Sequence, residues 1–263
     1  MSGHFITLGS RTGTAARLLC AVGILALAGV VVSCGGGYGN SYMAPASTPP
    51  PAAAQHTVTM GAITGFGSVF VNGLEFDTTG AAITVDGATA TQAELRAGDF
   101  VTVHGHHDSG SGKDVAEQID FRGDVQGPVS AIDVTAMTLT VLGQTVGVSA
   151  DTSFDDDISP ASLAGIAVAD MVEVSGMRAA DGTIHATRIE KKPAGSPLRV
   201  IGVAVGTDSA AMTLMINALT VNFTAATLAD FPATGPKDGD LVEATGSALN
   251  EIGRASCRER VCT

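Results

Sequence analysis

From about residue 57 to residue 246, short runs of apolar residues alternate with polar ones, and turn signals separate the runs. Alternation with a period of two is typical of strands that bury one face. In residues 124–192 the pattern predicts five strands rich in Val, Ile and Thr, at Val129–Ile132, Met137–Val141, Thr145–Val148, Met171–Ser175 and Ile184–Ile189. We therefore expect an all-β fold.

One eight-residue pattern occurs three times: Gly or Ala, then Asp, an apolar residue and Val, with Gly at the eighth position. It covers Gly98–Gly105, Ala169–Gly176 and Gly239–Gly246, at spacings of 71 and 70 residues. A fixed internal period of this kind indicates a tandem array. The sequence thus predicts three β-rich repeats, at residues 57–123 (repeat 1), 124–192 (repeat 2) and 198–250 (repeat 3).

Repeat 3 lacks part of this pattern. The pattern stops soon after Gly246, and no counterpart of the strand at Ile184–Ile189 follows. Because a missing strand leaves its neighbours with unpaired backbone groups, we expect an open strand edge and low stability in repeat 3.

Glycines mark the connections between the predicted strands. Leu142-Gly143 and Asp181-Gly182 stand where hairpin turns belong, since glycine accepts the positive φ of tight turns. In repeat 2, Ala169 replaces the glycine that begins the repeated pattern, which puts the conformation of that turn in doubt.

A short helical turn is predicted between the third and fourth strands. Thr91–Glu94 resembles a capping box, and Ser159-Pro160 offers an N-cap followed by proline at the first helical position. Three strands, a short helix and two more strands is the order of a small five-stranded OB-like β-barrel, in which closure removes exposed edges. We expect tandem OB-like barrels, with a small open sandwich as the alternative.

The N-terminal segment has the pattern of an export signal. Arg11 and Arg17 precede an apolar run, Leu18–Val32, that is short for a membrane span. The run ends in the sequence Val-Val-Ser-Cys, which resembles a bacterial lipobox. The resemblance implies that residues 1–33 are a lipoprotein signal peptide and that Cys34 carries acyl chains, which would anchor the protein to a membrane. An ordinary cleaved signal with an incidental cysteine is the alternative.

Residues 34–56 are rich in Gly, Ala, Ser and Pro and cannot bury a core, so we expect a tether. Gly35, rather than Asp, follows Cys34, and by resemblance to lipoproteins of two-membrane bacteria this implies delivery to the outer membrane. The expected location is the cell envelope, with the protein lipid-anchored to the outer membrane and facing the periplasm or the surface.

Charge narrows the choice of partners. Residues 35–250 hold nine of the 14 basic residues and 24 of the 26 acidic ones, a net charge of −15 against −12 for the whole chain. Such a surface repels phosphate backbones, and no basic stripe with interleaved aromatic residues offsets the repulsion, so we expect no nucleic-acid partner. All four cysteines lie outside the repeats, which must hold together by packing and strand pairing.

Residues 251–263 differ from the preceding chain in charge and cysteine content. They resemble the in-frame translation of a sequencing-library adaptor, and we expect them to be an artefact without a biological role. A genuine basic tail is the alternative.

Several motifs together are similar to a bacterial envelope family. They are Gly61–Gly73, Phe76–Thr78, Gly98-Asp99, Asp181–Ile184 and Ala186–Ile189. The family is the one named for domain of unknown function 5666, and the resemblance covers about residues 60–246. It implies export, repetition and a β-rich fold, and it supplies no catalytic residues.

One cluster of side chains could bind a metal. His104, His106 and His107 lie together beside Asp108, and strand alternation places His104 and His106 on one face. The alternative is a solvated loop, because repeat 2 has Ser, Met and Arg at the corresponding positions. Asp155–Asp157 lacks the spacing of a calcium loop and is interpreted as a solvated acidic turn.

Catalytic motifs are absent from the sequence: we find no nucleophile elbow, no cysteine in the repeats and no phosphate-binding loop. We therefore expect a non-enzymatic, membrane-anchored envelope lipoprotein that needs no cofactor and acts as a binding or structural module for a polymer, peptide or protein of the envelope. The first alternative is a metal-binding accessory protein that uses His104, His106 and His107. The second is an unrecognised hydrolase.

Overall fold

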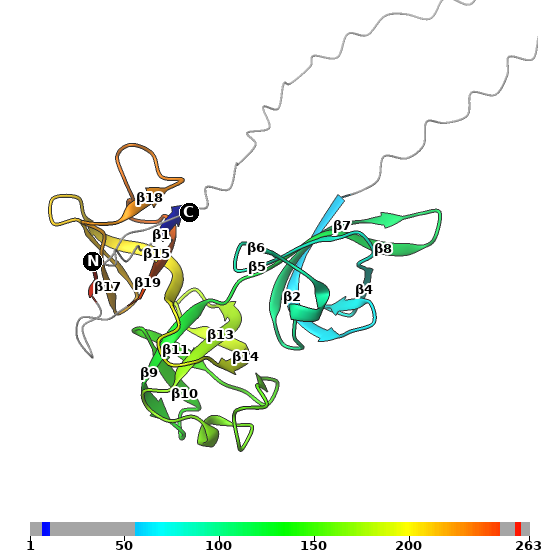
Figure 1. The fold of residues 1–263 in the computed structure, drawn as a ribbon, viewed down its shortest axis with the longest axis horizontal. Helices are drawn as coiled ribbons and strands as arrows, with labels where there is room; N and C mark the ends of the chain where they lie inside the picture. The colour runs from blue at the N-terminus through cyan, green and yellow to red at the C-terminus, as the bar shows by residue number, and fades with distance from the viewer. Residues whose placement is uncertain (1–6, 11–55, 248–255, 259–263) are drawn as a thin grey trace, which may run out of the picture. The chain divides into compact units, whose positions relative to one another are not determined.

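A computed structural model describes residues 7–10, 56–247 and 256–258, which form strands joined by turns (Figure 1). Cys34 and most of the predicted signal peptide, tether and tail lie outside the described residues. The described part is almost entirely β-structure, which confirms the predicted fold class. No helix among the described residues is long and apolar enough to span a membrane.

Repeat 1 is a closed five-stranded barrel with an added hairpin. Its strands are β2 (His56–Gly65), β3 (Val69–Val71), β4 (Leu74–Asp77), β5 (Ala82–Val85), β6 (Ala88–Ala90), β7 (Phe100–Asp108) and β8 (Lys113–Phe121). Hydrogen-bonded neighbours run β2-β3-β4-β8-β7 and back to β2. The pairing of β4 with β8 is parallel and closes the barrel, and the β5–β6 hairpin pairs with β8 outside this circuit.

Repeat 2 closes in the same way. Its strands are β9 (Val125–Asp133), β10 (Thr138–Val141), β11 (Gln144–Gly147), β12 (Ser153–Phe154), β13 (Met171–Arg178) and β14 (Ile184–Lys191). The circuit is β9-β10-β11-β14-β13, with β11 and β14 parallel and β13 paired back to β9. The five predicted strands are all present, and the short β12 is an addition. The prediction of tandem OB-like barrels is confirmed for repeats 1 and 2.

Alternating burial along each strand fills the barrels. In β7, Val101 and Val103 are fully buried, whereas the side chains between and beside them are partly exposed. Each fully buried side chain of this size stabilises the fold by about 1.5–3 kcal/mol. Repeat 1 has its own apolar core around Phe76 and Ile119. Apolar alternation, the signal from which the strands were predicted, therefore also supplies the side chains that fill the core of each barrel.

Repeats 2 and 3 share a single apolar core. Strand β9 pairs with β15 (Leu198–Asp208) of repeat 3, so that one sheet continues from one repeat into the next. The side chain of Gln144 is fully buried, and its amide nitrogen donates to the carbonyl oxygen of Ile216 at 2.8 Å. These two repeats are thus joined both by backbone pairing and by core packing.

The repeated aspartate closes the same turn in all three repeats. Its carboxylate accepts a hydrogen bond from the backbone N–H three residues earlier, at 2.7, 2.9 and 3.0 Å for Asp99, Asp170 and Asp240. The residue before each aspartate has a positive φ, at 92° for Gly98, 75° for Ala169 and 90° for Gly239. Repeat 2 therefore has the same turn as the other two repeats although Ala169 replaces glycine, and Ala169 adopts a left-handed conformation that is rare for alanine.

The other predicted turns are also present. Leu142 and Gly143, with φ of 47° and 69°, join β10 to β11, and Gly182, with φ of 88°, lies between β13 and β14. Thr91 caps a short 3₁₀ helix, η1 (Gln92–Glu94), and its backbone N–H donates to the Glu94 carboxylate at 2.9 Å, as the capping box predicts.

The predicted start of the second helical turn is wrong. The 3₁₀ helix η2 covers Leu163–Gly165, and its N-cap is Ser162 rather than Ser159. The reason lies in a tight turn that precedes the helix, in which the N–H of Ser162 donates to the carbonyl oxygen of Pro160 at 2.7 Å.

The strands that the repeat pattern leaves unpaired in repeat 3 gain partners in the structure, which corrects the expected open edge in part, but among the described strands the circuit of repeat 3 does not close as those of repeats 1 and 2 do. Its strands are β15, β16 (Thr213–Ile216), β17 (Leu219–Asn222), β18 (Thr227–Ala229) and β19 (Leu241–Gly246). Strand β1 (Thr7–Ser10) pairs with β19 and β18, and β20 (Ser256–Arg258) pairs with β17. In repeat 2 the corresponding pairings belong to β14, so β1 and β20 together take the place of the missing strand. Unpaired backbone groups favour the pairing of any extended segment that can reach them.

Asp124, at the start of repeat 2, is partly buried, and its carboxylate accepts a hydrogen bond from the N–H of Gly176 at 3.0 Å. Burial raises the pKa of Asp124 to about 6, although Arg178 and the hydrogen bond from Gly176 act in the opposite direction. The folded state therefore binds this proton more tightly than the unfolded chain does.

We expect Ala169→Gly to raise the free energy of unfolding by about 0.5–1 kcal/mol, because it relieves the left-handed conformation of Ala169. Urea denaturation measures the change. Ala167→Gly is the matched control in the same loop and should lower stability, since Ala167 is not among the residues with positive φ. Equal losses in the two variants would contradict this interpretation of the turn.

We also expect the raised pKa of Asp124 to affect the pH dependence of stability. Because the folded pKa is above the unfolded one, the contribution of Asp124 to stability rises as pH falls through about 6 and levels off below about 4. Between pH ~7.5 and pH ~5, wild type should gain roughly 1 kcal/mol relative to Asp124→Asn. The measurement is urea unfolding of both proteins at both pH values. If the free energy of unfolding depends on pH in the same way for both proteins, the prediction is refuted.

Candidate metal centre

A β-bulge shapes the outer face of the β7–β8 hairpin in repeat 1. The register of the two strands shifts between His104 and Gly105, and Glu117 is left without a partner in β7. A bulge of this kind reorients the extra side chain, and Glu117 and Gln118 are exposed in succession. A Cβ at Gly105 would overlap the carbonyl oxygen of Val115, so this close approach of the strands requires glycine.

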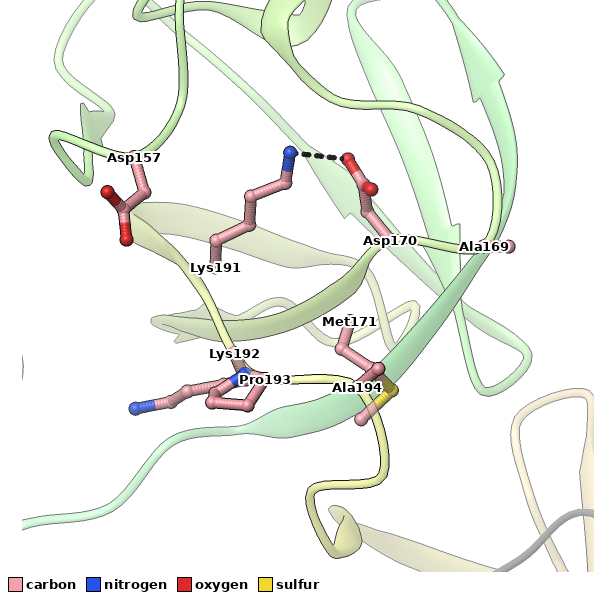
Figure 2. Close-up of a pocket in the computed structure, with 8 residues that line it drawn as sticks. All are labelled: Asp157, Ala169, Asp170, Met171, Lys191, Lys192, Pro193 and Ala194. Carbon is pink, nitrogen blue, oxygen red and sulfur yellow. Dashed lines mark ion pairs between the residues drawn. The ribbon is translucent and has the colours of Figure 1, made fainter.

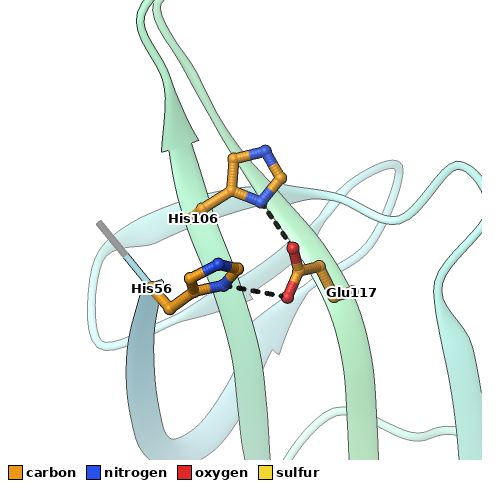
Figure 3. A group of neighbouring side chains, drawn as sticks. All are labelled: His56, His106 and Glu117. Carbon is orange, nitrogen blue, oxygen red and sulfur yellow. Dashed lines mark hydrogen bonds and ion pairs between the residues drawn. The ribbon is translucent and has the colours of Figure 1, made fainter. Parts of the chain in front are cut away.

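Three side chains converge over this bulge (Figure 3). His56 on β2 lies directly opposite His106 on β7 in the antiparallel register. Nδ1 of His106 is 2.9 Å from Oε1 of Glu117, and Nδ1 of His56 is 3.2 Å from Oε2 of the same carboxylate. The two imidazole rings have centroids 6.0 Å apart and are inclined at 64°. One carboxylate therefore contacts two imidazoles that come from neighbouring strands.

The group lies at the surface and opens to solvent. The side chain of His106 is 26% exposed, that of Glu117 44% and that of His56 69%. One potential ligand atom from each residue lies within 4.8 Å of the other two. In the part of the chain that the structure describes, this is the one group of three His, Cys, Asp or Glu side chains that meets that spacing.

The structure brings together only one of the three predicted histidines. His106 belongs to the group, whereas His104 pairs in register with Val58 and Gln118. The side chain of His107 contacts Asp114, with Nδ1 and Oδ1 2.9 Å apart.

Sequence reasoning missed His56 and Glu117 for two different reasons. His56 becomes a neighbour of His106 only through the pairing of the first and fourth barrel strands, which are 50 residues apart in the chain. The position of Glu117 depends on the bulge, which breaks strict alternation. A search of the predicted barrel for histidines opposite one another on these two strands would have found His56.

In the acidic run of repeat 2, Asp156 and Asp157 are exposed, as a solvated turn predicts, whereas Asp155 is partly buried. Asp155 pairs with the guanidinium of Arg188 at 3.1 Å. Asp157 lines a pocket of about 360 Å³ whose wall includes Asp170, Lys191 and Lys192.

Figure 2 shows the Lys191 ammonium group turned toward the Asp170 carboxylate, and the two are 2.9 Å apart. Lys192 pairs with Glu173 at 2.8 Å and with Glu190 at 3.0 Å. Because carboxylates within the protein already neutralise both lysines, this pocket offers less to an anionic ligand than its lysines suggest.

The comparisons with known proteins agree with the two closed barrels. Residues 58–120 and 126–190 each match the family described as domain of unknown function (DUF5666), so the chain shows two tandem matches to this domain. No curated protein and no solved structure gave a match. The matched ranges coincide with repeats 1 and 2, and the first of them contains His106 and Glu117.

Proposed function

We propose, from two tandem DUF5666 matches that follow an apolar run ending at Cys34, that the chain is a lipid-anchored protein of the bacterial cell envelope. In this proposal residues 1–33, and β1 with them, are removed, which leaves unpaired the edges of β18 and β19 that β1 covers in the full chain. Acyl chains on Cys34 then hold the protein at the outer membrane, facing the periplasm or the surface. The tether is residues 34–55, because His56, which the sequence pattern assigned to it, begins β2. The barrels act as a non-enzymatic binding or structural module for an envelope polymer, peptide or protein.

The observation that carries this proposal is the lipobox-like sequence that ends at Cys34. The barrels are consistent with a module of this kind. Their apolar side chains fill closed cores, so contacts with a partner fall to the turns and the outer faces of the strands. The core shared by repeats 2 and 3 would hold the outer faces of these two repeats in fixed positions. This favours a role in which the protein presents those faces to a partner at a set spacing.

Metal binding by an accessory protein is the second candidate function, and a specific observation favours it. Repeat 1 gathers histidine and carboxylate side chains on one face, where their potential ligand atoms converge. Such a protein would bind a divalent metal ion in the envelope, whether or not it also contacts a polymer. The second candidate does not depend on acylation of Cys34.

For the leading proposal, we expect mass spectrometry of the protein from a membrane fraction to find an acylated N-terminal peptide that begins at Cys34. Cys34→Ser should leave the protein unacylated and move it out of that fraction, because the thiol is the acceptor atom. Cys20→Ser is the matched control, since Cys20 lies inside the apolar run, and it should leave acylation unchanged. An intact, unmodified N-terminus on protein from the cytosol would refute the lipid anchor.

A further inference from the structure

We propose that His56, His106 and Glu117 bind one divalent transition-metal ion of the zinc type, at a site with a coordination position open to solvent. The proposal rests on the second candidate function, and it names the ligands and the class of metal. It is independent of the lipid anchor. It also differs from the set expected from the sequence, because His104 and His107 are not ligands.

The distances suit a metal of this size. Zinc bonds to nitrogen and oxygen are about 2.0–2.2 Å, so two ligands at a tetrahedral angle lie roughly 3.3 Å apart. The contacts between Glu117 and the two histidines are 2.9 and 3.2 Å, close to that spacing. Figure 3 shows both imidazoles turned toward the same carboxylate, so small changes in side-chain torsion bring an ion into contact with all three residues.

The ligand types select the class of metal. Two imidazole nitrogens and one carboxylate suit zinc and its neighbours in the first transition row, whereas calcium and magnesium take oxygen ligands almost exclusively. Three protein ligands leave the fourth tetrahedral position for water or for an atom of another molecule. The exposure of His56, at 69%, places that open position toward solvent.

Comparison with repeat 2 shows which features of the site belong to the repeated fold and which are the ligands themselves. Its β13–β14 hairpin has the same bulge, and a Cβ at Gly176 would overlap the carbonyl oxygen of His185. Thr187 takes the place of Glu117 there, and Met177 takes the place of His106. The bulge therefore belongs to the repeated fold, whereas the ligand set belongs to repeat 1 alone. We expect one ion per chain rather than one per barrel.

A bound ion would also connect three strands. His56 begins β2, His106 lies near the end of β7, and Glu117 lies in β8. Because the ion would bind the folded arrangement and not the unfolded chain, it should raise the melting temperature as its concentration rises. In addition to the heat of binding, this gives a second readout.

The test is calorimetric titration of zinc into the purified full chain, with Cys20, Cys34, Cys257 and Cys262 first alkylated so that thiolates do not bind the metal. Wild type should bind one ion and melt at a higher temperature with zinc, and calcium or magnesium should do neither. His106→Ala and Glu117→Gln should each weaken zinc binding by at least roughly tenfold, because loss of even a supporting contact outside the ligand set typically costs about that much. His104→Ala and His107→Ala are the matched controls and should bind as wild type does.

The outcomes separate this site from the broader function. An alkylated wild type that binds no zinc overturns both the site and the second candidate function. Zinc binding that is lost in His104→Ala or His107→Ala, or kept in both His106→Ala and Glu117→Gln, overturns the site and leaves metal binding in place. Melting curves recorded without metal identify any variant that has failed to fold. If His106→Ala does not fold, Glu117→Gln still tests the site, because it keeps the shape of an exposed side chain.

Discussion

The parallel pairing of the third and fifth strands is the constraint on which each barrel depends. In repeat 1 it joins β4 to β8 at Phe76 and Asp114, and in repeat 2 it joins β11 to β14 at Val146 and Ile184. With this pairing the sheet closes, no edge remains in the circuit, and the alternating apolar side chains all face one enclosed core. Without it the same strands would form an open sheet with one exposed apolar face.

Closure of the barrels also determines where groups that bind a ligand can lie. Because the inward positions are filled by apolar side chains, polar groups that can bind a ligand lie on the outer faces, at turns and at bulges. The bulge beside Gly105 and its counterpart beside Gly176 use the same backbone geometry to carry different side chains. A small barrel repeated in one chain thus keeps its internal constraints and varies its outer surface.

Much of the fold could be predicted from the sequence, because the signals for it are local. Apolar alternation located the five strands of repeat 2, and the capping box at Thr91 located the first helical turn. Predictions failed where a contact distant in the chain decides the outcome. Strand β1 pairs with β19 although more than 200 residues separate them, so an edge that is open in the repeat pattern is covered in the structure.

For the candidate site, too, the local features could be predicted from the sequence and the contacts between distant residues could not. Alternation correctly placed His104 and His106 on one face of a strand, but it could not show which of them meets another ligand. That depends on the register between β2 and β7 and on the bulge that turns Glu117 outward. Register and bulges follow from how strands pack, which a single strand pattern does not encode.

Native-state amide hydrogen exchange along the closing seam of repeat 1 tests the central claim most directly. If the barrel is closed, the paired amides of β4 and β8 exchange as slowly as those of β7 in the middle of the sheet, because opening any of them requires loss of the whole barrel. If β4 exchanges at the fast rate of an exposed edge strand while β7 stays protected, the sheet is open and the account is contradicted.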